Sequence, residues 1–307
     1  MKVWIAHEAG LSLLGEPPPG VTVELLTAPD APLPSDPAGV EFWVPPFLSS
    51  GTVVHLTEKL VDLRVVQLLS AGADAWTGRL PPGVRLYDGR GVHSSSTSEW
   101  IVTAILSYLR DFHSFIRHQA TRDWSYSRYA PTDELAGKRV LIVGAGDIGE
   151  ATARRLAPFE VSLTRVARTA RPGVHGIDEL PELLPEADVV VLIVPLTGQT
   201  RGMVDAAFLA RMRDGALLVN AARGPVVDTA ALTAELATGR IGAAVDVTEP
   251  EPLPADHPLW TMPSFLLTPH VAGSVRGLLP RAYRLVADQL RRYVSGEPLI
   301  NEVRDGY

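Results

Sequence analysis

The feature that most constrains this 307-residue chain is the stretch VLIVGAGDIG at residues 140–149. An apolar run, which we interpret as a buried strand, leads into a G-x-G-x-x-G turn, and the helix-forming residues 150–157 follow. In such a unit the first glycine permits a tight turn, the second lets the backbone approach a pyrophosphate, and the third allows close helix–strand packing. The stretch therefore predicts a dinucleotide-binding site made by Gly144, Gly146, Asp147, Ile148 and Gly149.

The position of this motif near the middle of the chain predicts that one domain is inserted into another. On both sides of it, short apolar runs alternate with potential helices or with segments rich in Pro and Gly, as in βαβ units around a parallel sheet. We therefore expect an α/β protein with two doubly wound parallel-sheet domains. A Rossmann cofactor domain over residues 95–274 would be inserted into a flavodoxin-like substrate domain over residues 1–94 and 275–307.

The periodicity also predicts individual elements. A tail over Val275–Ser295 has one apolar face, which indicates an amphipathic helix that returns to the first domain. The strands are expected at Lys2–Ala6, Val21–Leu26, Val40–Val44, Val65–Leu69, Val84–Tyr87, Val161–Val166, Val189–Val194, Ala216–Asn220, Ala243–Val247 and Phe265–Thr268.

Composition excludes several classes of protein and of site. The formal net charge is −7, from 28 basic and 35 acidic residues without a basic block, so nothing indicates a nucleic-acid partner. The longest apolar run, Val189–Val194, is too short to span a membrane. His7 and Glu8 interrupt the N-terminus before a signal-peptide core could form, and we expect a cytoplasmic protein. The absence of cysteine excludes disulfides and thiolate ligands, and no metal site is expected.

The end of the second cofactor-domain strand indicates which nucleotide binds. Sites that prefer NAD usually carry Asp or Glu there to hold the ribose 2′-OH. This chain continues Ala167-Arg-Thr-Ala-Arg171, and its first acidic residue is Asp178. A carboxylate would repel a 2′-phosphate, whereas a guanidinium can bind it with two hydrogen bonds. We therefore expect NADP (NADPH) to be preferred, with NAD possible, and the phosphate to lie at Arg168, Thr169 and Arg171.

Three polar elements follow later strands of the same domain. Arg223 follows the run 216–220, Glu249 and Glu251 lie in an acidic turn after Asp246, and His270 follows the last strand. Open α/β sheets bind ligands at the carboxyl ends of their strands, so these residues could form a hydride-transfer site. Each also has an ordinary structural interpretation when it is considered singly. Arg223 could cap a strand, the acidic turn could simply be solvated, and His270 could be a hydrogen-bonded loop histidine.

The order of these motifs resembles that of the D-isomer-specific 2-hydroxyacid dehydrogenases, and most of all their NADP-preferring glyoxylate/hydroxypyruvate reductase branch. The matching motifs are GAGDIG, VPLT, NAARG, DVTEPEP, HPLW and TPHVAG, in that order. The resemblance covers nearly the whole chain and is clearest over residues 135–273. It implies that Arg223 binds the substrate, that His270 is the acid/base and that Glu251 is its carboxylate partner.

The same resemblance implies further contacts and a reaction. It places Asp246 near the nicotinamide carboxamide, Pro195 and Gly273 at the cofactor, and the backbone amides of Ala71 and Gly72 at the substrate carboxylate. The implied reaction reduces a small 2-oxo acid, of the glyoxylate or hydroxypyruvate type, to the D-2-hydroxy acid. His270, as the imidazolium, would donate the proton.

The residue at position 251 and the resemblance to other members of the superfamily bear on the alternative functions. Formate dehydrogenases of this superfamily pair the histidine with glutamine, so Glu251 argues against formate oxidation. A nucleotide-sensing binding protein, as in corepressors that resemble this family, and an oxidoreductase acting on phosphite remain alternatives. We further expect a homodimer packed near Trp124 and Tyr126, and we expect Trp260 of the HPLW motif to be buried.

Overall fold

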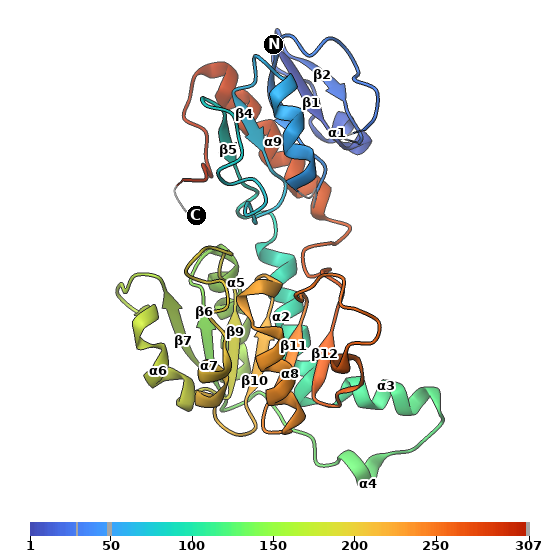
Figure 1. Cartoon of the computed structure of the whole chain (residues 1–307), viewed down its shortest axis with the longest axis vertical. Helices are drawn as coiled ribbons and strands as arrows, with labels where there is room; N and C mark the ends of the chain where they lie inside the picture. The colour runs from blue at the N-terminus through green and yellow to red at the C-terminus, as the bar shows by residue number, and fades with distance from the viewer. Residues whose placement is uncertain (29, 48–50, 305–307) are drawn as a thin grey trace. The chain divides into compact units, whose positions relative to one another are not determined.

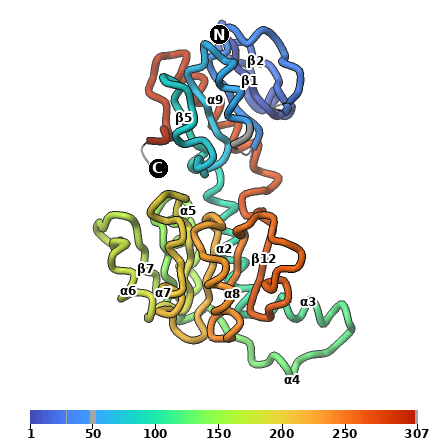
Figure 2. Tube along the Cα trace, viewed as in Figure 1, coloured from blue at the N-terminus to red at the C-terminus, as the bar shows by residue number. Residues whose placement is uncertain are grey.

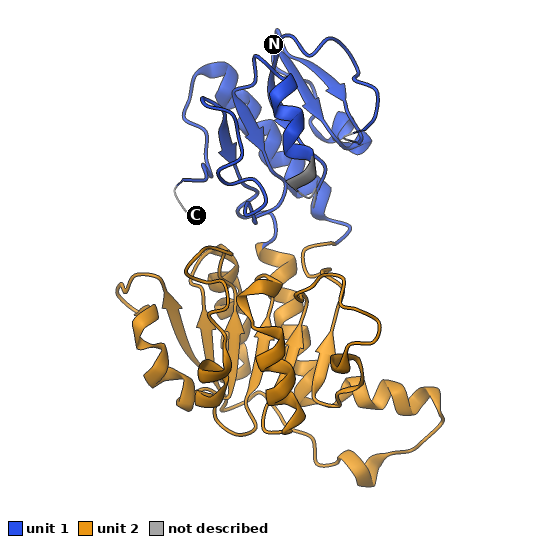
Figure 3. Cartoon of the chain, viewed as in Figure 1, with its two compact units in different colours: residues 1–93, 275–307 blue, residues 94–274 orange. Residues whose placement is uncertain are grey.

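The computed structural model describes residues 1–28, 30–47 and 51–304. The chain divides into two compact units (Figure 3). Unit 1 consists of Met1–His93 and Val275–Tyr307, and unit 2 of Ser94–Ser274. The first and last segments of the chain therefore share a unit, as the blue and red ends of the trace in Figure 2 show. Each unit is built on one parallel sheet, which confirms the predicted fold class.

Unit 1 contains a five-stranded sheet of order β2-β1-β3-β4-β5, in which every neighbouring pair is parallel (Figure 1). Its strands are β1 (Lys2–Ile5), β2 (Thr22–Leu25), β3 (Val40–Val44), β4 (Val65–Gln67) and β5 (Arg85–Tyr87). Its helices are α1 (Glu8–Leu13), the 3₁₀ helix η1 (Gly51–Lys59) and α9 (Leu278–Ser295).

Alternate residues of these strands enter two apolar layers. Ile5 and Phe42 pack with α9, through Tyr283 among others, whereas Trp4 and Trp43 belong to the layer on the opposite face. A sheet covered on both faces requires apolar side chains at consecutive positions, which explains why its strands are continuous apolar runs. The long helix begins at Leu278 rather than at the predicted Val275, because Val275–Gly277 form a turn closed by the bond from the Leu278 N–H to the Val275 carbonyl.

Unit 2 contains a seven-stranded parallel sheet of order β12-β11-β10-β9-β6-β7-β8. Its strands are β6 (Arg139–Val143), β7 (Ser162–Ala167), β8 (His175–Gly176), β9 (Val189–Leu192), β10 (Leu217–Asn220), β11 (Gly242–Val245) and β12 (Phe265–Leu267). Its α-helices are α2 (Ser94–Leu109), α3 (Phe112–Ala120), α4 (Tyr126–Tyr129), α5 (Asp147–Leu156), α6 (Leu180–Leu183), α7 (Ala206–Arg211) and α8 (Thr229–Ala237). Its 3₁₀ helices are η2 (Ala157–Phe159), η3 (Ile177–Glu179), η4 (Leu184–Glu186), η5 (Gly224–Val226) and η6 (Pro258–Thr261).

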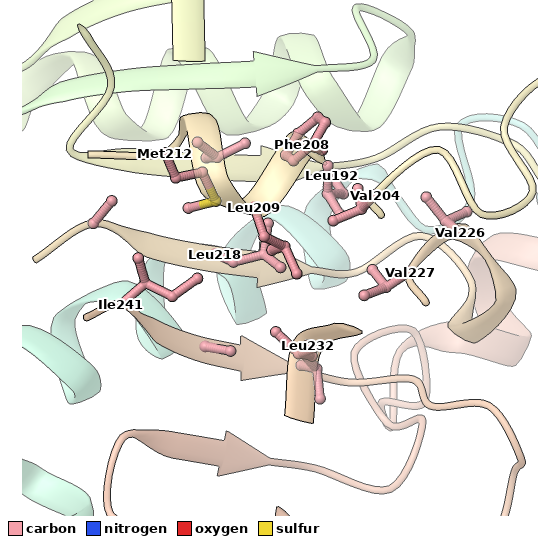
Figure 4. Packing of buried hydrophobic residues seen from close by; sticks show 14 of the residues in the cluster. Leu192, Val204, Phe208, Leu209, Met212, Leu218, Val226, Val227, Leu232 and Ile241 are labelled. Atoms are coloured by element: carbon pink, nitrogen blue, oxygen red, sulfur yellow. The ribbon is translucent and has the colours of Figure 1, made fainter. Parts of the chain in front are cut away.

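Helices cover both faces of this sheet. Helices α2 and α5 pack on the face that carries Val140 and Ile142, and α7 and α8 pack on the face that carries Leu141 and Val143. Figure 4 shows part of the second layer, with Leu209 of α7, Leu218 of β10 and Leu232 of α8 among its labelled side chains. The two layers hold the strand ends, and therefore the loops that follow them, in fixed positions. No helix in the described ranges has the length and apolarity needed to cross a bilayer.

Further sequence predictions need correction at the level of single elements. Strands β4 and β11 end at Gln67 and Val245, two residues before the predicted Leu69 and Val247. Strand β9 ends at Leu192 and not at Val194. The Ile193 N–H still donates to the Val143 carbonyl oxygen at 2.8 Å, but Pro195 has no N–H with which to continue the pairing. The prediction that Trp260 is buried is wrong, since 53% of its surface is exposed. In the 3₁₀ helix η6 the neighbouring Leu259 occupies the core instead, and the Trp260 indole donates to the Pro254 carbonyl at 2.8 Å.

Candidate active site

The glycine-rich turn lies where the strand order of unit 2 reverses. The chain leaves β6 toward β7 and β8 on one side, and β9 returns on the other side of β6. At this point Gly144 has φ = 117°, and a Cβ atom added to it would lie 2.4 Å from the Ile193 carbonyl oxygen. A Cβ on Gly149 would lie 1.9 Å from the Gly144 carbonyl oxygen. Neither position therefore tolerates a side chain, and the turn and helix α5 are tightly packed.

The middle glycine of the motif has a different environment. Within the described part of the chain, a Cβ added to Gly146 would meet no atom within 4 Å. Gly146 is the N-cap residue of α5, so the first N–H groups of this ten-residue helix, beginning at Asp147 and Ile148, lie beside that open space. A helix N-terminus next to unobstructed backbone is suited to a phosphate group. The turn therefore fits the pyrophosphate of a dinucleotide.

The arginine-containing loop follows directly on β7. Arg168 and Thr169 are exposed, whereas the Arg171 guanidinium is held over the turn by a 2.8 Å bond from Nη2 to the Ala145 carbonyl oxygen. Three exposed groups that can contact an anion thus lie beside the glycine-rich turn. Their arrangement fits a phosphate on the adenosine ribose.

An ion pair that sequence reasoning missed stabilises this loop. Arg165 on β7 donates through Nη1 to both carboxylate oxygens of Glu150, at 2.9 and 3.1 Å, and through Nη2 to the Gly173 carbonyl oxygen at 3.1 Å. The pair ties the loop to α5 and neutralises a carboxylate in the first turn of that helix, where it would repel a phosphate. The signal in the sequence was opposite charge on two consecutive elements of one βαβ unit.

Arg223 is held in a rigid turn after β10. The Asn220 side chain accepts the Ala222 N–H at 3.0 Å and donates to the Arg223 carbonyl oxygen at 3.1 Å. The Arg223 side chain folds back to donate to the Ala222 carbonyl oxygen at 2.8 Å. A Cβ on Gly224 would lie 1.9 Å from the Thr248 carbonyl oxygen, so this turn packs directly against the segment after β11.

Asp246 is a buried carboxylate with several hydrogen-bond donors. Its Oδ1 accepts from the Thr268 hydroxyl at 2.6 Å and from the Val271 N–H at 2.9 Å, and its Oδ2 accepts from the Ala272 N–H at 2.8 Å. The Asp246 carbonyl oxygen also accepts the His270 N–H at 2.7 Å. Asp246 therefore holds the backbone of His270 and of the two residues after it, together with the side chain of Thr268 before it, a function that the sequence did not reveal.

His270 and Glu251 form a direct pair. The distance from His270 Nδ1 to Glu251 Oε1 is 2.6 Å, and both side chains are partly exposed, at 29% and 42%. His270 has φ = 54°, a backbone conformation that is uncommon for a residue with a side chain and is often found at functional sites. Because the carboxylate can only accept, Nδ1 carries the proton and Nε2 is the ring nitrogen that can serve a substrate.

The other predicted site residues lie at strand ends. Pro195 follows β9, and its carbonyl oxygen accepts the Thr200 hydroxyl at 2.6 Å. Gly273 lies in a turn closed by the bond from the Ser274 N–H to the Val271 carbonyl oxygen. Ala71 and Gly72 lie in unit 1, in the loop after β4. The structure thus gathers the unit 2 candidates at the carboxyl edge of one sheet and places the unit 1 candidates at the equivalent edge of the other sheet.

Comparison with known proteins extends this description. Residues 102–272 match the model of the D-isomer specific 2-hydroxyacid dehydrogenase family, NAD binding domain. A glyoxylate reductase from Thermofilum pendens is 36% identical over 252 residues, which are 77% of this chain and 73% of that protein. A chloroplastic/mitochondrial formate dehydrogenase from Arabidopsis thaliana is 30% identical over 275 residues, or 85% of this chain and 72% of that protein.

A solved structure agrees over the whole length. The NADPH-dependent glyoxylate/hydroxypyruvate reductase of Sinorhizobium meliloti, in complex with NADP and sulfate, superposes with a TM-score of 0.85 at 28% identity. The match covers 100% of this chain and 99% of that one. The extent of the family match and the similarity of both units settle the classification. The chain belongs to the D-isomer specific 2-hydroxyacid dehydrogenases and is an NAD(P)-dependent oxidoreductase of that family.

Proposed function

We propose that this enzyme reduces a small 2-oxo acid, of the glyoxylate or hydroxypyruvate type, to the D-2-hydroxy acid with NADPH. The observation that carries the proposal is the 2.6 Å pair of His270 and Glu251, which lies at the same sheet edge as the glycine-rich turn and Arg223. The similarity to glyoxylate reductases supports the choice of substrate class.

The proposed cofactor site uses three groups of residues. The turn from Gly144 to Gly149, with Asp147 and Ile148 in it, would hold the pyrophosphate through backbone N–H groups. Arg168, Thr169 and Arg171 would hold the 2′-phosphate. Pro195, Asp246 and Gly273 are the expected neighbours of the remainder of the cofactor, which supplies the hydride when it is bound.

The residues of the chain would supply the remaining chemistry. Arg223, together with the backbone amides of Ala71 and Gly72, would bind the carboxylate of the substrate. His270 as the imidazolium would donate a proton from Nε2 to the oxygen formed when C2 accepts the hydride, and would recover that proton from solvent. The carboxylate of Glu251 would hold the ring and stabilise its positive charge.

A substrate panel tests the proposal against its alternatives. Purified protein is assayed with glyoxylate and hydroxypyruvate, using NADPH and NADH, and in the opposite direction with formate and phosphite. We expect rapid NADPH oxidation with the 2-oxo acids and a lower Michaelis constant for NADPH than for NADH. Nucleotide binding without turnover of any of these compounds would favour a sensor. Turnover of phosphite or formate alone would favour the corresponding dehydrogenase.

We further propose that the enzyme is a homodimer that associates through the segment around α3 and α4. This segment exposes the large apolar side chains of Phe112, Ile116, Trp124 and Tyr126, and Trp124 is 93% exposed. Exposed aromatic residues grouped in one segment are typical of an interface. Light scattering of the wild type and of Trp124→Ser tests the proposal. We expect the wild type to be a dimer and the variant to be a weaker dimer or a monomer.

A further inference from the structure

The loop after β4 is anchored by a buried histidine that the proposed mechanism does not use. His93 Nε2 lies 2.8 Å from the Leu69 carbonyl oxygen. Because a carbonyl oxygen can only accept, the ring must carry its proton on Nε2 and donate it. The His93 ring is also stacked on Phe47, with centroids 5.6 Å apart and planes inclined by 15°. Since His93 is only 6% exposed, this donor has a fixed orientation.

Two further bonds fix the peptide groups that follow. The Gly89 N–H donates to the Ser70 carbonyl oxygen at 2.7 Å, and the Ser70 hydroxyl donates to the Gly72 carbonyl oxygen at 2.8 Å. A Cβ on Gly89 would lie 2.4 Å from the Leu69 carbonyl oxygen, so the segment after β5 packs directly on this loop. The loop is therefore held by its carbonyl groups.

Anchored carbonyl groups determine where the amide groups point. In a trans peptide the C=O and N–H bonds point in opposite directions. The bond from His93 to Leu69 therefore directs the Ser70 N–H away from His93, and the bond from Gly89 to Ser70 directs the Ala71 N–H away from Gly89. Successive N–H groups that point to the same side of a loop form an anion-binding concavity.

We propose that His93 is a positioning residue for substrate recognition. Through its hydrogen bond to the Leu69 carbonyl oxygen it fixes the first peptide group of the loop whose backbone amides, at Ala71 and Gly72, would bind the substrate. The inference rests on the proposed function, because it assumes that these amides bind the carboxylate of a 2-oxo acid. His93 acts through the loop, and its contribution should appear in carboxylate binding and not in nucleotide binding.

Substitutions that separate the hydrogen bond from the ring test this assignment. His93→Phe keeps an aromatic ring against Phe47 but removes the donor, and His93→Leu removes both. His93→Gln keeps an N–H donor. We expect the two variants without a donor to raise the Michaelis constant for glyoxylate and the inhibition constant of oxalate by about tenfold each, as expected for the loss of one buried hydrogen bond. His93→Gln should stay within about twofold of the wild type, and the Michaelis constant for NADPH should not change in any variant.

Gln289→Leu is the matched control for a general loss of stability in unit 1. Gln289 is fully buried and donates to Gln67 and to the Ile300 carbonyl oxygen, both at 2.8 Å, so its substitution also breaks buried hydrogen bonds but leaves the Leu69 carbonyl bonded. It should lower the melting temperature without raising the oxalate constant. If one of His93→Phe and His93→Leu does not fold, the other alone still tests the role of the hydrogen bond.

The outcomes separate this inference from the proposed function. An active wild type whose glyoxylate and oxalate constants are unchanged in His93→Phe or His93→Leu would overturn the role of His93 alone. An equal rise in Gln289→Leu would also overturn it, because the effect would then reflect general stability. A wild type that reduces no 2-oxo acid would overturn the proposed function and this inference together.

Discussion

The Thr268 hydroxyl donates a 2.6 Å hydrogen bond to Asp246 and accepts the indole N–H of Trp100 at 2.9 Å. Trp100 lies in α2, Asp246 follows β11, and Thr268 precedes the turn that carries His270. The chain therefore fixes the position of its proposed acid/base through a series of hydrogen bonds between the buried Asp246 and the part-buried Thr268 and Trp100. Asp246 has a structural function in this series of hydrogen bonds.

Replacing Asp246 by asparagine should disrupt this series of hydrogen bonds. The Asp246 carboxylate now accepts three hydrogen bonds, from the Thr268 hydroxyl and from the Val271 and Ala272 N–H groups. The NH₂ group of asparagine cannot accept, so at least one of these donors would be buried without an acceptor. We expect the free energy of unfolding to fall by about 1–3 kcal/mol and turnover to fall with it. Chemical denaturation and steady-state kinetics measure both. Glu249→Gln, an exposed change in the neighbouring turn, is the control and should match the wild type.

Arg168→Asp should reverse the nucleotide preference. The change removes a cation expected at the 2′-phosphate and introduces a repelling charge, so NADPH binding should weaken by about 2–3 kcal/mol, while NADH binding should be retained. Fluorescence titration with both nucleotides checks this. Arg154→Asp, on the exposed side of α5, controls for the change in net charge. A wild type that binds NADH more tightly than NADPH would contradict the assignment of the loop.

His270→Ala should lower turnover by about 10²- to 10⁴-fold, because the proton donor is lost, while NADPH still binds. Glu251→Gln should cause a smaller loss, because the ring keeps a hydrogen-bonding neighbour but loses the negative charge 2.6 Å away. Single-turnover kinetics and nucleotide titration separate the two effects. Wild-type turnover in His270→Ala would remove this residue from the mechanism.

Arg223→Lys should retain the positive charge yet lose activity. An ammonium group cannot reproduce the two-point geometry of a guanidinium on a carboxylate, so kcat/KM for glyoxylate should fall about 10- to 100-fold. The kcat/KM for glycolaldehyde, which lacks a carboxylate, should fall much less. Equal losses on both substrates would argue for a different function of Arg223.

His7 should make the stability of unit 1 depend on pH. Its ring lies 3.1 Å from the Tyr283 hydroxyl, and burial lowers the pKa of His7 below its ordinary value of 6.5. Burial also raises the pKa of Tyr283 to about 12, so that hydroxyl stays neutral in the relevant range. Below about pH 6.5 the unfolded chain takes up a proton at His7 that the folded chain does not, so the stability contributed by this residue falls as pH falls.

Urea denaturation between pH 5 and 8 of the wild type and of His7→Asn tests this sign. We expect the wild-type free energy of unfolding to decrease more steeply on acidification than that of the variant, because asparagine does not titrate. Parallel curves would show that His7 is not responsible.

Features of this chain that depend on neighbouring residues could be predicted better than those that depend on distant ones. The apolar runs predicted both sheets because a strand covered on two faces must be apolar at successive positions, and the glycine spacing predicted the cofactor turn because steric limits are local. The ends of elements were less well predicted. The residue at which β9 ends and the exposure of Trp260 both depend on the segments that pack beside them.

The fold class and the family could be predicted without coordinates, since both follow from motifs whose members are near one another in the chain or appear in a fixed order. The pairing of polar side chains, in contrast, could be read only from the folded chain. Arg165 pairs with Glu150, Thr268 with Asp246, and His93 with the carbonyl group of Leu69, across separations of 15, 22 and 24 residues. Such contacts depend on strand order and on the direction of each side chain, which parallel pairing and the packing of the two apolar layers determine together.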